Sequence, residues 1–138
     1  MQNKKYSYTW YWIHFTLCSQ FQDMKITVIK ESDMDNWAYY LRIFQATPFI
    51  SDLWLKSFRN PNREPIFFRF VSQEKTIGII GGLIIKSSYR ILKKTDKSIF
   101  FFSSPVVINS DKEIIKACIK ELTDYAALNR YTVLEFRS

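Results

Sequence analysis

Hydrophobic and polar residues follow two different periods along this chain. Residues 25–30 form a short β-branched run, which predicts a strand. Residues 34–44 place apolar side chains three and four positions apart, which predicts an amphipathic helix that Ser32 can cap. Pro48 ends that pattern, and Ser51 can cap a second, short helix through about residue 58. This region is therefore expected to combine one strand with two helices.

Three further strand patterns occupy residues 66–72, 76–86 and 98–103. A short polar turn at residues 73–75 joins the first two, so we expect them to pair antiparallel. All three glycines of the chain lie inside the middle strand, at Gly78, Gly81 and Gly82. Glycine inside a strand predicts a bulge or a close approach of another part of the chain.

A long helix is predicted after Asn109 and Ser110, either of which can cap it, because apolar residues from Ile114 to Ala126 share one helical face. Residues 131–137 form the last strand pattern. Since a helix connects the fourth strand to the fifth, we expect these two strands to be parallel in one sheet. The element order β-α-α-β-β-β-α-β predicts an α+β domain with a mixed, mainly antiparallel sheet.

Composition and charge exclude some classes of protein and argue against some partners. The chain has 138 residues with 47% hydrophobic residues, 3 Gly and 4 Pro, which excludes a disordered or low-complexity chain. The formal charge is +7, but the excess is spread evenly apart from one basic run in residues 86–97. We interpret this run, which contains Lys93, Lys94 and Lys97, as a solvated loop and expect no nucleic-acid partner. Cys18 and Cys118 lack the spacing of a metal or redox motif, so no metal site is expected.

Residues 1–23 are predicted to be separate from the domain at residues 24–138. They form an aromatic leader behind two lysines, or an upstream extension of a protein that starts at Met24. The apolar run is too aromatic and polar for a signal peptide and too short to cross a bilayer. We therefore expect a cytoplasmic protein that contacts a membrane at most peripherally. The single histidine, His14, lies in this segment, so a histidine base is not expected in the domain.

Five segments carry a resemblance to a known family: residues 46–51 leading into Trp54, the strand 77–85, the strand entering Ser103-Ser104-Pro105, the helix with Leu122 and Tyr125, and the strand 133–136. Residues 37–137 resemble the first half of the bacterial FemAB-like aminoacyltransferases, which build peptidoglycan bridges and consist of two halves of the GNAT N-acyltransferase fold. The resemblance implies a GNAT-like fold for residues 24–138. It also implies that the chain is truncated after the fifth strand, or is a standalone half.

The resemblance implies no bound cofactor. GNAT members that bind acyl-CoA carry a Gly-rich turn, Q/R-x-x-G-x-G/A, before the long helix, where backbone N–H groups meet the pyrophosphate. The corresponding residues 103–110 contain no glycine, and Asp111 and Glu113 place negative charge at the helix start. Bridge-forming relatives do not use CoA, and their first half mainly holds a muropeptide precursor. The implied partner is therefore a phosphorylated sugar or peptidoglycan precursor.

Three residues are candidate substrate-binding residues. Lys56 follows Trp54 by two positions, where the resemblance implies a basic residue that faces the phosphates of the acceptor; a solvated helix lysine is the alternative. Trp54 belongs to the core or forms a platform for the ligand. Arg137, beside Glu135, lies at the exit of the last strand, where α/β sheets bind ligands, or simply on one sheet face. No catalytic residue is assigned, because Ser103 and Ser104 lack a histidine partner.

Our first hypothesis is a truncated or standalone half of a FemAB-like N-acyltransferase that is not catalytically competent alone. It would bind a phosphorylated cell-wall or sugar precursor, or pair with another subunit. The last strand exposes part of an apolar sheet edge, which predicts a possible homo-oligomer through residues 131–137. The alternatives are an active small acyl-CoA-dependent N-acyltransferase and a basic nucleic-acid-binding module.

Overall fold

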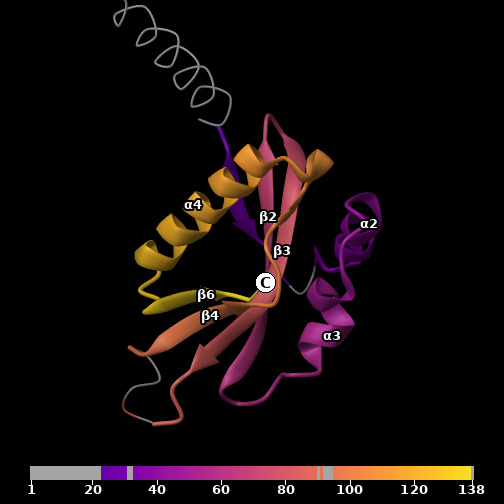
Figure 1. Ribbon diagram of the computed structural model, residues 1–138. Coiled ribbons are helices and arrows are strands. Elements are labelled where there is room, and N and C mark those ends of the chain that lie inside the picture. The colour runs from indigo at the N-terminus through magenta and orange to yellow at the C-terminus, as the bar shows by residue number, and fades with distance from the viewer. Residues whose placement is uncertain (1–22, 31–32, 90, 92–94, 138) are drawn as a thin grey trace, which may run out of the picture.

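The computed structural model describes residues 23–30, 33–89, 91 and 95–137 (Figure 1). The expectations for a separate leader, for Ser32 as a helix cap and for Lys93 and Lys94 in the basic run fall outside these ranges. The boundary between residues 1–23 and the domain at 24–138 stays a prediction.

The elements follow in the order β1 (Lys25–Val28), α2 (Asp35–Ile43), η2 (Pro48–Ile50), α3 (Asp52–Lys56), β2 (Arg63–Ser72), β3 (Lys75–Lys86), β4 (Lys97–Phe101), β5 (Val106–Val107), η3 (Ile108–Ser110), α4 (Lys112–Leu128) and β6 (Val133–Phe136). The predicted order is confirmed, and the structure adds the short strand β5 and two 3-10 turns. β4 ends at Phe101 instead of at the expected Ser103, because the chain leaves the sheet there.

The described strands form one sheet in the order β1-β2-β3-β4-β6, with β5 beside β3. β4 and β6 are parallel, and the other neighbours are antiparallel. The expected parallel pairing of the strands that flank the long helix is therefore confirmed, as is the mixed, mainly antiparallel sheet.

Helices cover both faces of this sheet: α4 lies on one face, and α2 and α3 lie on the other (Figure 1). Neighbouring residues of β2 point to opposite faces, so Phe67 packs with Trp37 and Leu55 beneath α2 and α3, whereas Phe68 packs with Leu122 beneath α4. All five side chains are buried. Two hydrophobic cores thus hold the helices against the sheet.

The polar turn between β2 and β3 is a two-residue hairpin loop. Gln73 and Glu74 adopt φ values of 50° and 63°, and Ser72 pairs with Lys75. Two successive residues with positive φ are typical of a type I′ turn, whose twist matches that of the flanking strands. The turn was predicted from its polarity, although neither residue is the glycine or asparagine that usually marks this conformation.

The glycines of β3 stand where other groups come close to its backbone. A Cβ atom on Gly82 would lie 2.6 Å from the carbonyl oxygen of Phe100, and one on Gly81 would lie 2.7 Å from Cδ1 of Leu55. The predicted close approach is confirmed. The register shifts between the pairs Phe70–Gly78 and Val71–Thr76, which leaves Ile77 of β3 as an extra residue next to Gly78, so the predicted bulge in this strand is confirmed as well.

Candidate functional site

β4 pairs with β6 up to the end of β4. They pair from Ser98 with Val133 to Phe101 with Phe136, and the N–H of Arg137 donates to the carbonyl of Phe101 at 2.9 Å. Beyond Phe101 the chain leaves β3 opposite Gly82 and rejoins it at Val106, opposite Ile79. We call residues 102–105 together with Arg137 the strand split.

Polar groups in the strand split have no partner. Within the described part of the chain, Ser103 and Ser104 make no backbone hydrogen bond. The side-chain oxygen of Ser103 is buried and has no hydrogen-bond partner among those residues. Because buried polar groups in proteins are nearly always paired, this hydroxyl, in the segment that leaves β3 after Phe101, suits a hydrogen bond to a ligand or a water molecule.

An aromatic cluster lines the α3 side of the strand split. The ring of Trp54 lies 4.5 Å from that of Phe102 and 4.8 Å from that of Phe58, and Phe102 lies 4.8 Å from Phe100. The guanidinium group of Arg137 lies 5.2 Å from the centre of the Phe100 ring. Two of the three predicted site residues, Trp54 and Arg137, thus belong to one cluster. Trp54 is half-buried, so it packs as a core residue and still presents part of its ring.

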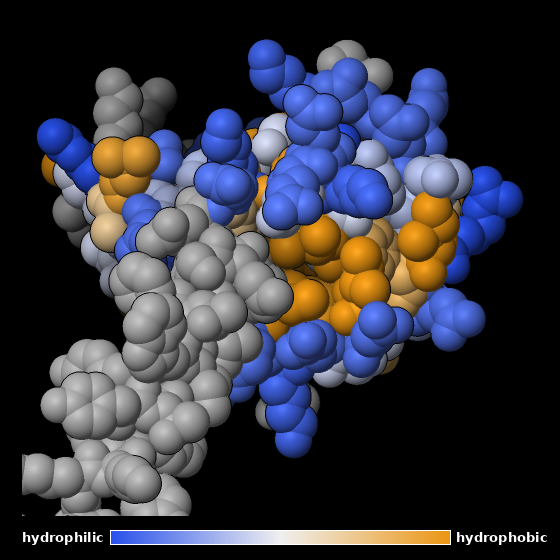
Figure 2. Space-filling view, turned by 90° about the horizontal axis from the view of Figure 1, so that it is seen from above, coloured by the Kyte–Doolittle hydropathy of each residue, from blue (hydrophilic) through white to orange (hydrophobic). Residues whose placement is uncertain are grey.

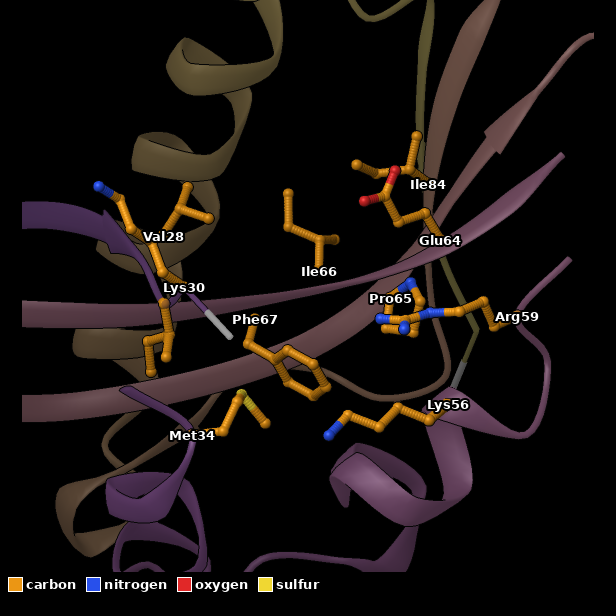
Figure 3. Close-up of a pocket in the computed structure, with 11 residues that line it drawn as sticks. Val28, Lys30, Met34, Lys56, Arg59, Glu64, Pro65, Ile66, Phe67 and Ile84 are labelled. Carbon is orange, nitrogen blue, oxygen red and sulfur yellow. The ribbon is translucent and has the colours of Figure 1, made fainter. Parts of the chain in front are cut away.

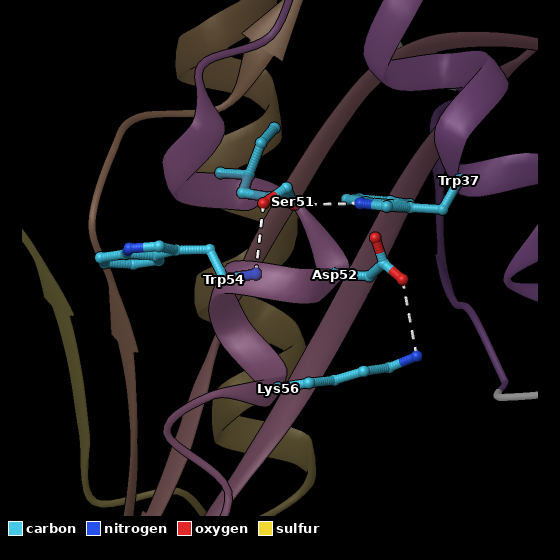
Figure 4. A network of polar contacts seen from close by, with 6 residues as sticks. Trp37, Ser51, Asp52, Trp54 and Lys56 are labelled. Carbon is cyan, nitrogen blue, oxygen red and sulfur yellow. Dashed lines mark hydrogen bonds and ion pairs between the residues drawn. The ribbon is translucent and has the colours of Figure 1, made fainter.

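Local hydrogen bonds around α3 fix the directions of its side chains (Figure 4). The side-chain oxygen of Ser51 accepts the N–H of Trp54 at 3.3 Å and caps the helix as predicted. The indole N–H of Trp37 donates to the carbonyl of Ile50 at 2.9 Å, which ties α2 to the start of α3. Leu55, which lies between Trp54 and Lys56 in the chain, is fully buried. The side chains of Trp54 and Lys56 therefore lie in different surroundings.

Lys56 lines a pocket of about 330 Å³ that does not include Trp54 or Arg137. We call it the basic pocket. Its cationic lining residues are Lys30, Lys56 and Arg59, and Glu64 is the acidic one. The side chain of Lys56 extends from the end of α3 toward Phe67, and that of Arg59 extends from the loop after α3 toward Pro65 (Figure 3). The structure therefore separates Lys56 from the other two predicted site residues.

Positive charge exceeds negative charge around this pocket. A second pocket of about 300 Å³ shares Arg59 and Glu64 with it and adds Arg63 and Lys86. Two ion pairs partly offset the excess: Lys56 lies 3.5 Å from Asp52, and Lys86 lies 3.4 Å from Glu64. Five cationic side chains thus face two acidic ones in this region. Such a concave basic surface suits an anionic ligand.

The start of α4 differs in chemical character from the basic pocket. Asp111 caps the helix, because its side chain accepts the N–H of Glu113 at 2.8 Å. The prediction that Asn109 or Ser110 caps the helix is therefore wrong. These two residues adopt φ values of 57° and 51° in the preceding turn. A pocket of about 500 Å³ lies beside this turn and is lined without any charged residue. Its lining residues are Ile43, Phe44, Gln45, Val107, Ile108, Asn109 and Ser110.

The surface around the start of α4 is apolar and carries negative charge, so it does not suit a phosphate group. Ile43 and Ile108 are exposed, and Figure 2 shows an apolar patch framed by hydrophilic side chains on the face that carries the start of α4. The helix N-terminus, which attracts anions by its dipole, is already occupied by the carboxylates of Asp111 and Glu113. The pyrophosphate of an acyl-CoA therefore does not fit the residues present here.

One polar contact was not found from the sequence. Arg69 of β2 donates from Nη1 to the hydroxyl of Tyr40 in α2 at 2.9 Å. Hydrogen bonding to Thr76, together with the hydrogen bond and charge of Arg69, lowers the pKa of Tyr40, although burial opposes the shift. The signal in the sequence is that Arg69 interrupts the apolar run of residues 66–71.

The described residues provide no metal site. No group of three or more His, Cys, Asp and Glu side chains gathers among them in a way that could hold a metal ion. Burial raises the pKa of Cys118 to about 12, with a smaller contribution from the negative charge of Glu121. The thiol is therefore protonated at neutral pH, as expected of a buried structural cysteine.

Comparison with known proteins identifies the fold. No protein-family model and no curated protein sequence matches the chain. Its structure is similar to that of an N-acetyltransferase from Staphylococcus aureus Mu50, with a TM-score of 0.55 and 17% identity over 80% of this chain and 68% of that one. An aminoglycoside acetyltransferase from an uncultured soil metagenomic sample gives a TM-score of 0.53 and 17% identity over 85% and 78%. A GNAT family acetyltransferase from S. aureus subsp. aureus USA300_TCH1516 gives 0.51 and 13% over 84% and 87%.

The chain has a GNAT fold. The mixed, mainly antiparallel open sheet matches the structures of these acetyltransferases. The predicted GNAT-like fold is confirmed, while the FemAB-like subtype stays a prediction. No helix in the described part of the chain is long and apolar enough to cross a membrane, and the cytoplasmic location also stays a prediction.

Proposed function

We propose that the chain is an N-acyltransferase module of the FemAB-like kind that binds a phosphorylated sugar or peptidoglycan precursor. The observation that carries the proposal is the separation of the basic pocket from the strand split within a GNAT fold. The basic pocket gathers cationic side chains, whereas the start of α4 gathers carboxylates and apolar residues. Phosphate recognition therefore belongs to the basic pocket.

The strand split supports an acyl-binding role. An extended acyl-bearing chain needs hydrogen-bond partners along its length, and the unpaired backbone groups of Ser103 and Ser104 can supply them. The aromatic cluster beside the split can cover the apolar part of such a chain, since Trp54 and Phe102 present half-buried rings. This arrangement orients an acyl group without requiring a phosphate site at α4.

Among the described residues, the side chains near the split include no histidine that could transfer a proton to or from Ser103 or Ser104. The carboxylate of Glu135 lies 3.8 Å from Arg137. Efficient acyl transfer to an amine needs a base that can take a proton from the acceptor. We therefore expect the chain to bind its ligand without turning it over, unless a second subunit completes the site.

Replacing Lys56 by glutamine is expected to weaken binding of a nucleotide-linked muropeptide precursor about tenfold, because a charged hydrogen bond to phosphate contributes roughly 1.5–3 kcal/mol. Isothermal titration calorimetry with the precursor, and with the same muropeptide lacking phosphate, measures this effect. The unphosphorylated compound should bind weakly and equally to both proteins.

A matched control for this experiment is Lys116→Gln. Lys116 also pairs with an acidic residue of its own helix, Glu113 at 3.3 Å, but it lies on α4 away from the basic pocket. It should leave the affinity unchanged. Equal affinities of the wild-type chain and Lys56→Gln would contradict the assignment of phosphate to the basic pocket.

Acetyl-CoA is expected to give no saturable rise in melting temperature, because Asp111 and Glu113 repel its phosphates at the start of α4. A ligand present at a hundred times its dissociation constant would stabilise the fold by about 2.7 kcal/mol, which differential scanning fluorimetry detects easily. A clear saturable shift would instead favour the alternative function, an active acyl-CoA-dependent N-acyltransferase.

A further inference from the structure

A second pocket, of about 300 Å³, adjoins the basic pocket and shares two lining residues with it. Strands β2 and β3 contribute to both pockets: residues 64–67 and Ile84 line the basic pocket, and Arg63, Glu64 and Lys86 line the second pocket. The second pocket is therefore displaced by two residues along β3 and by about as much along β2. A displacement of two residues along a strand corresponds to about 7 Å.

Backbone hydrogen bonds fix the loop that carries the second pocket. Asn60 and Arg63 exchange two backbone hydrogen bonds of 3.1 Å, and the side-chain oxygen of Asn60 accepts the N–H of Asn62 at 2.8 Å. The N–H of Lys86 donates to the carbonyl of Asn62 at 2.8 Å and joins this loop to β3. Since the backbone around Arg63 and Lys86 is already ordered, a ligand that binds there pays little entropy for ordering it.

One carboxylate belongs to both pockets. Glu64 projects from β2 next to Ile84 of β3 (Figure 3), lines both pockets and pairs with Lys86 at 3.4 Å. Arg63 is exposed, and among the described residues no ion pair or hydrogen bond holds its guanidinium group. Arg63 therefore suits an anionic group in the second pocket. Negative charge beside Glu64 would be repelled, whereas a hydroxyl group there can donate a hydrogen bond to the carboxylate.

We propose that the two pockets together bind a polyol or sugar that carries an anionic group at each end. A phosphate lies in the basic pocket at Lys56, the second anionic group lies at Arg63, and an uncharged, hydroxyl-bearing segment between them lies at Glu64. Inorganic pyrophosphate does not fit, because its two phosphorus atoms share one oxygen and its charge would lie beside the carboxylate. This inference rests on the proposed function, since it adds a second contact to the ligand whose phosphate is assigned to the basic pocket.

Calorimetric titration of the full chain with four small probes tests the spacing. The first probe is glycerol with a phosphate on each terminal carbon, and the others are the same bisphosphate without the central hydroxyl, glycerol with a single terminal phosphate, and inorganic pyrophosphate. The glycerol bisphosphate should bind at least about tenfold more tightly than the monophosphate or pyrophosphate, because both of its charged contacts form within one ligand. Loss of the central hydroxyl should weaken binding about fivefold, since Glu64 then loses its donor.

Arg63→Gln identifies the second contact. It should weaken binding of the glycerol bisphosphate about tenfold and leave the affinity for the monophosphate unchanged, whereas Lys56→Gln should weaken binding of both. The matched control is Arg130→Gln, because Arg130 is also exposed but follows α4 and lines neither pocket. It should leave all four affinities unchanged. Circular dichroism confirms that every variant is folded.

The two variants separate this inference from the proposed function. If Lys56→Gln weakens binding of the monophosphate but Arg63→Gln leaves binding of the bisphosphate unchanged, the two-pocket ligand is overturned while the phosphate at the basic pocket stands. Pyrophosphate that binds as tightly as the glycerol bisphosphate, or a bisphosphate that does not bind, also overturns the inference. If Lys56→Gln changes the affinity for neither probe, the phosphate assignment of the proposed function fails, and the inference fails with it.

Discussion

Trp37→Ala is expected to lower the free energy of unfolding by about 4 kcal/mol, a large part of the stability of a domain of this size. The side chain is fully buried, its ring packs at 4.9 Å from that of Phe67, and its indole N–H satisfies the carbonyl of Ile50. Alanine would leave a cavity and an unpaired buried carbonyl. Urea denaturation followed by far-ultraviolet circular dichroism measures the change.

Trp37→Phe separates the two contributions. It keeps most of the apolar volume but removes the donor to Ile50, so it should cost about 1–3 kcal/mol, less than alanine. Because this hydrogen bond ties α2 to the start of α3, both variants should also weaken ligand binding at Lys56. A Trp37→Ala protein with wild-type stability would show that α2 is not anchored through this residue.

Gly82→Ala is expected to cost about 3 kcal/mol of stability. A Cβ atom there would lie 2.6 Å from the carbonyl oxygen of Phe100, which belongs to the neighbouring strand and can move only if β3 and β4 separate. The same substitution displaces the residues that lead into the strand split. Thermal unfolding should show a lower melting temperature, and binding of any acyl donor should weaken with it.

Gly81→Ala is the matched comparison. Its Cβ atom would meet Cδ1 of Leu55 at 2.7 Å, which is the end of a flexible side chain and can rotate away. The loss of stability should therefore be clearly smaller than that of Gly82→Ala. If the two variants lost equal stability, side-chain crowding in general would explain the result, and the close approach of β4 to Gly82 would not.

Local patterns predicted the elements because each depends on interactions within a few residues. The apolar run of residues 66–71, the capping serine at Ser51 and the apolar face of α4 are all signals within short stretches of the chain. The parallel pairing of β4 and β6 was also predictable, since a long helix between two strands of one sheet leaves little choice. The resemblance to the GNAT fold rested on this order of elements.

The candidate site was only partly predictable. Trp54, Lys56 and Arg137 were chosen as one set, yet Lys56 lines the basic pocket while the other two join the aromatic cluster. The helical turn between Trp54 and Lys56 directs the two side chains to different neighbours, and those neighbours come from distant parts of the chain. The contact of Arg69 with Tyr40 joins residues 29 positions apart and was missed for the same reason.

By itself, the sequence determined the order and type of the elements, the absence of a glycine-rich phosphate turn before α4 and the negative charge at the start of that helix. Only the tertiary structure decided where β4 leaves the sheet and which cations share a pocket. The physical reason is range: propensity and capping act along the chain, whereas pockets and strand edges arise from packing between segments that are far apart in sequence.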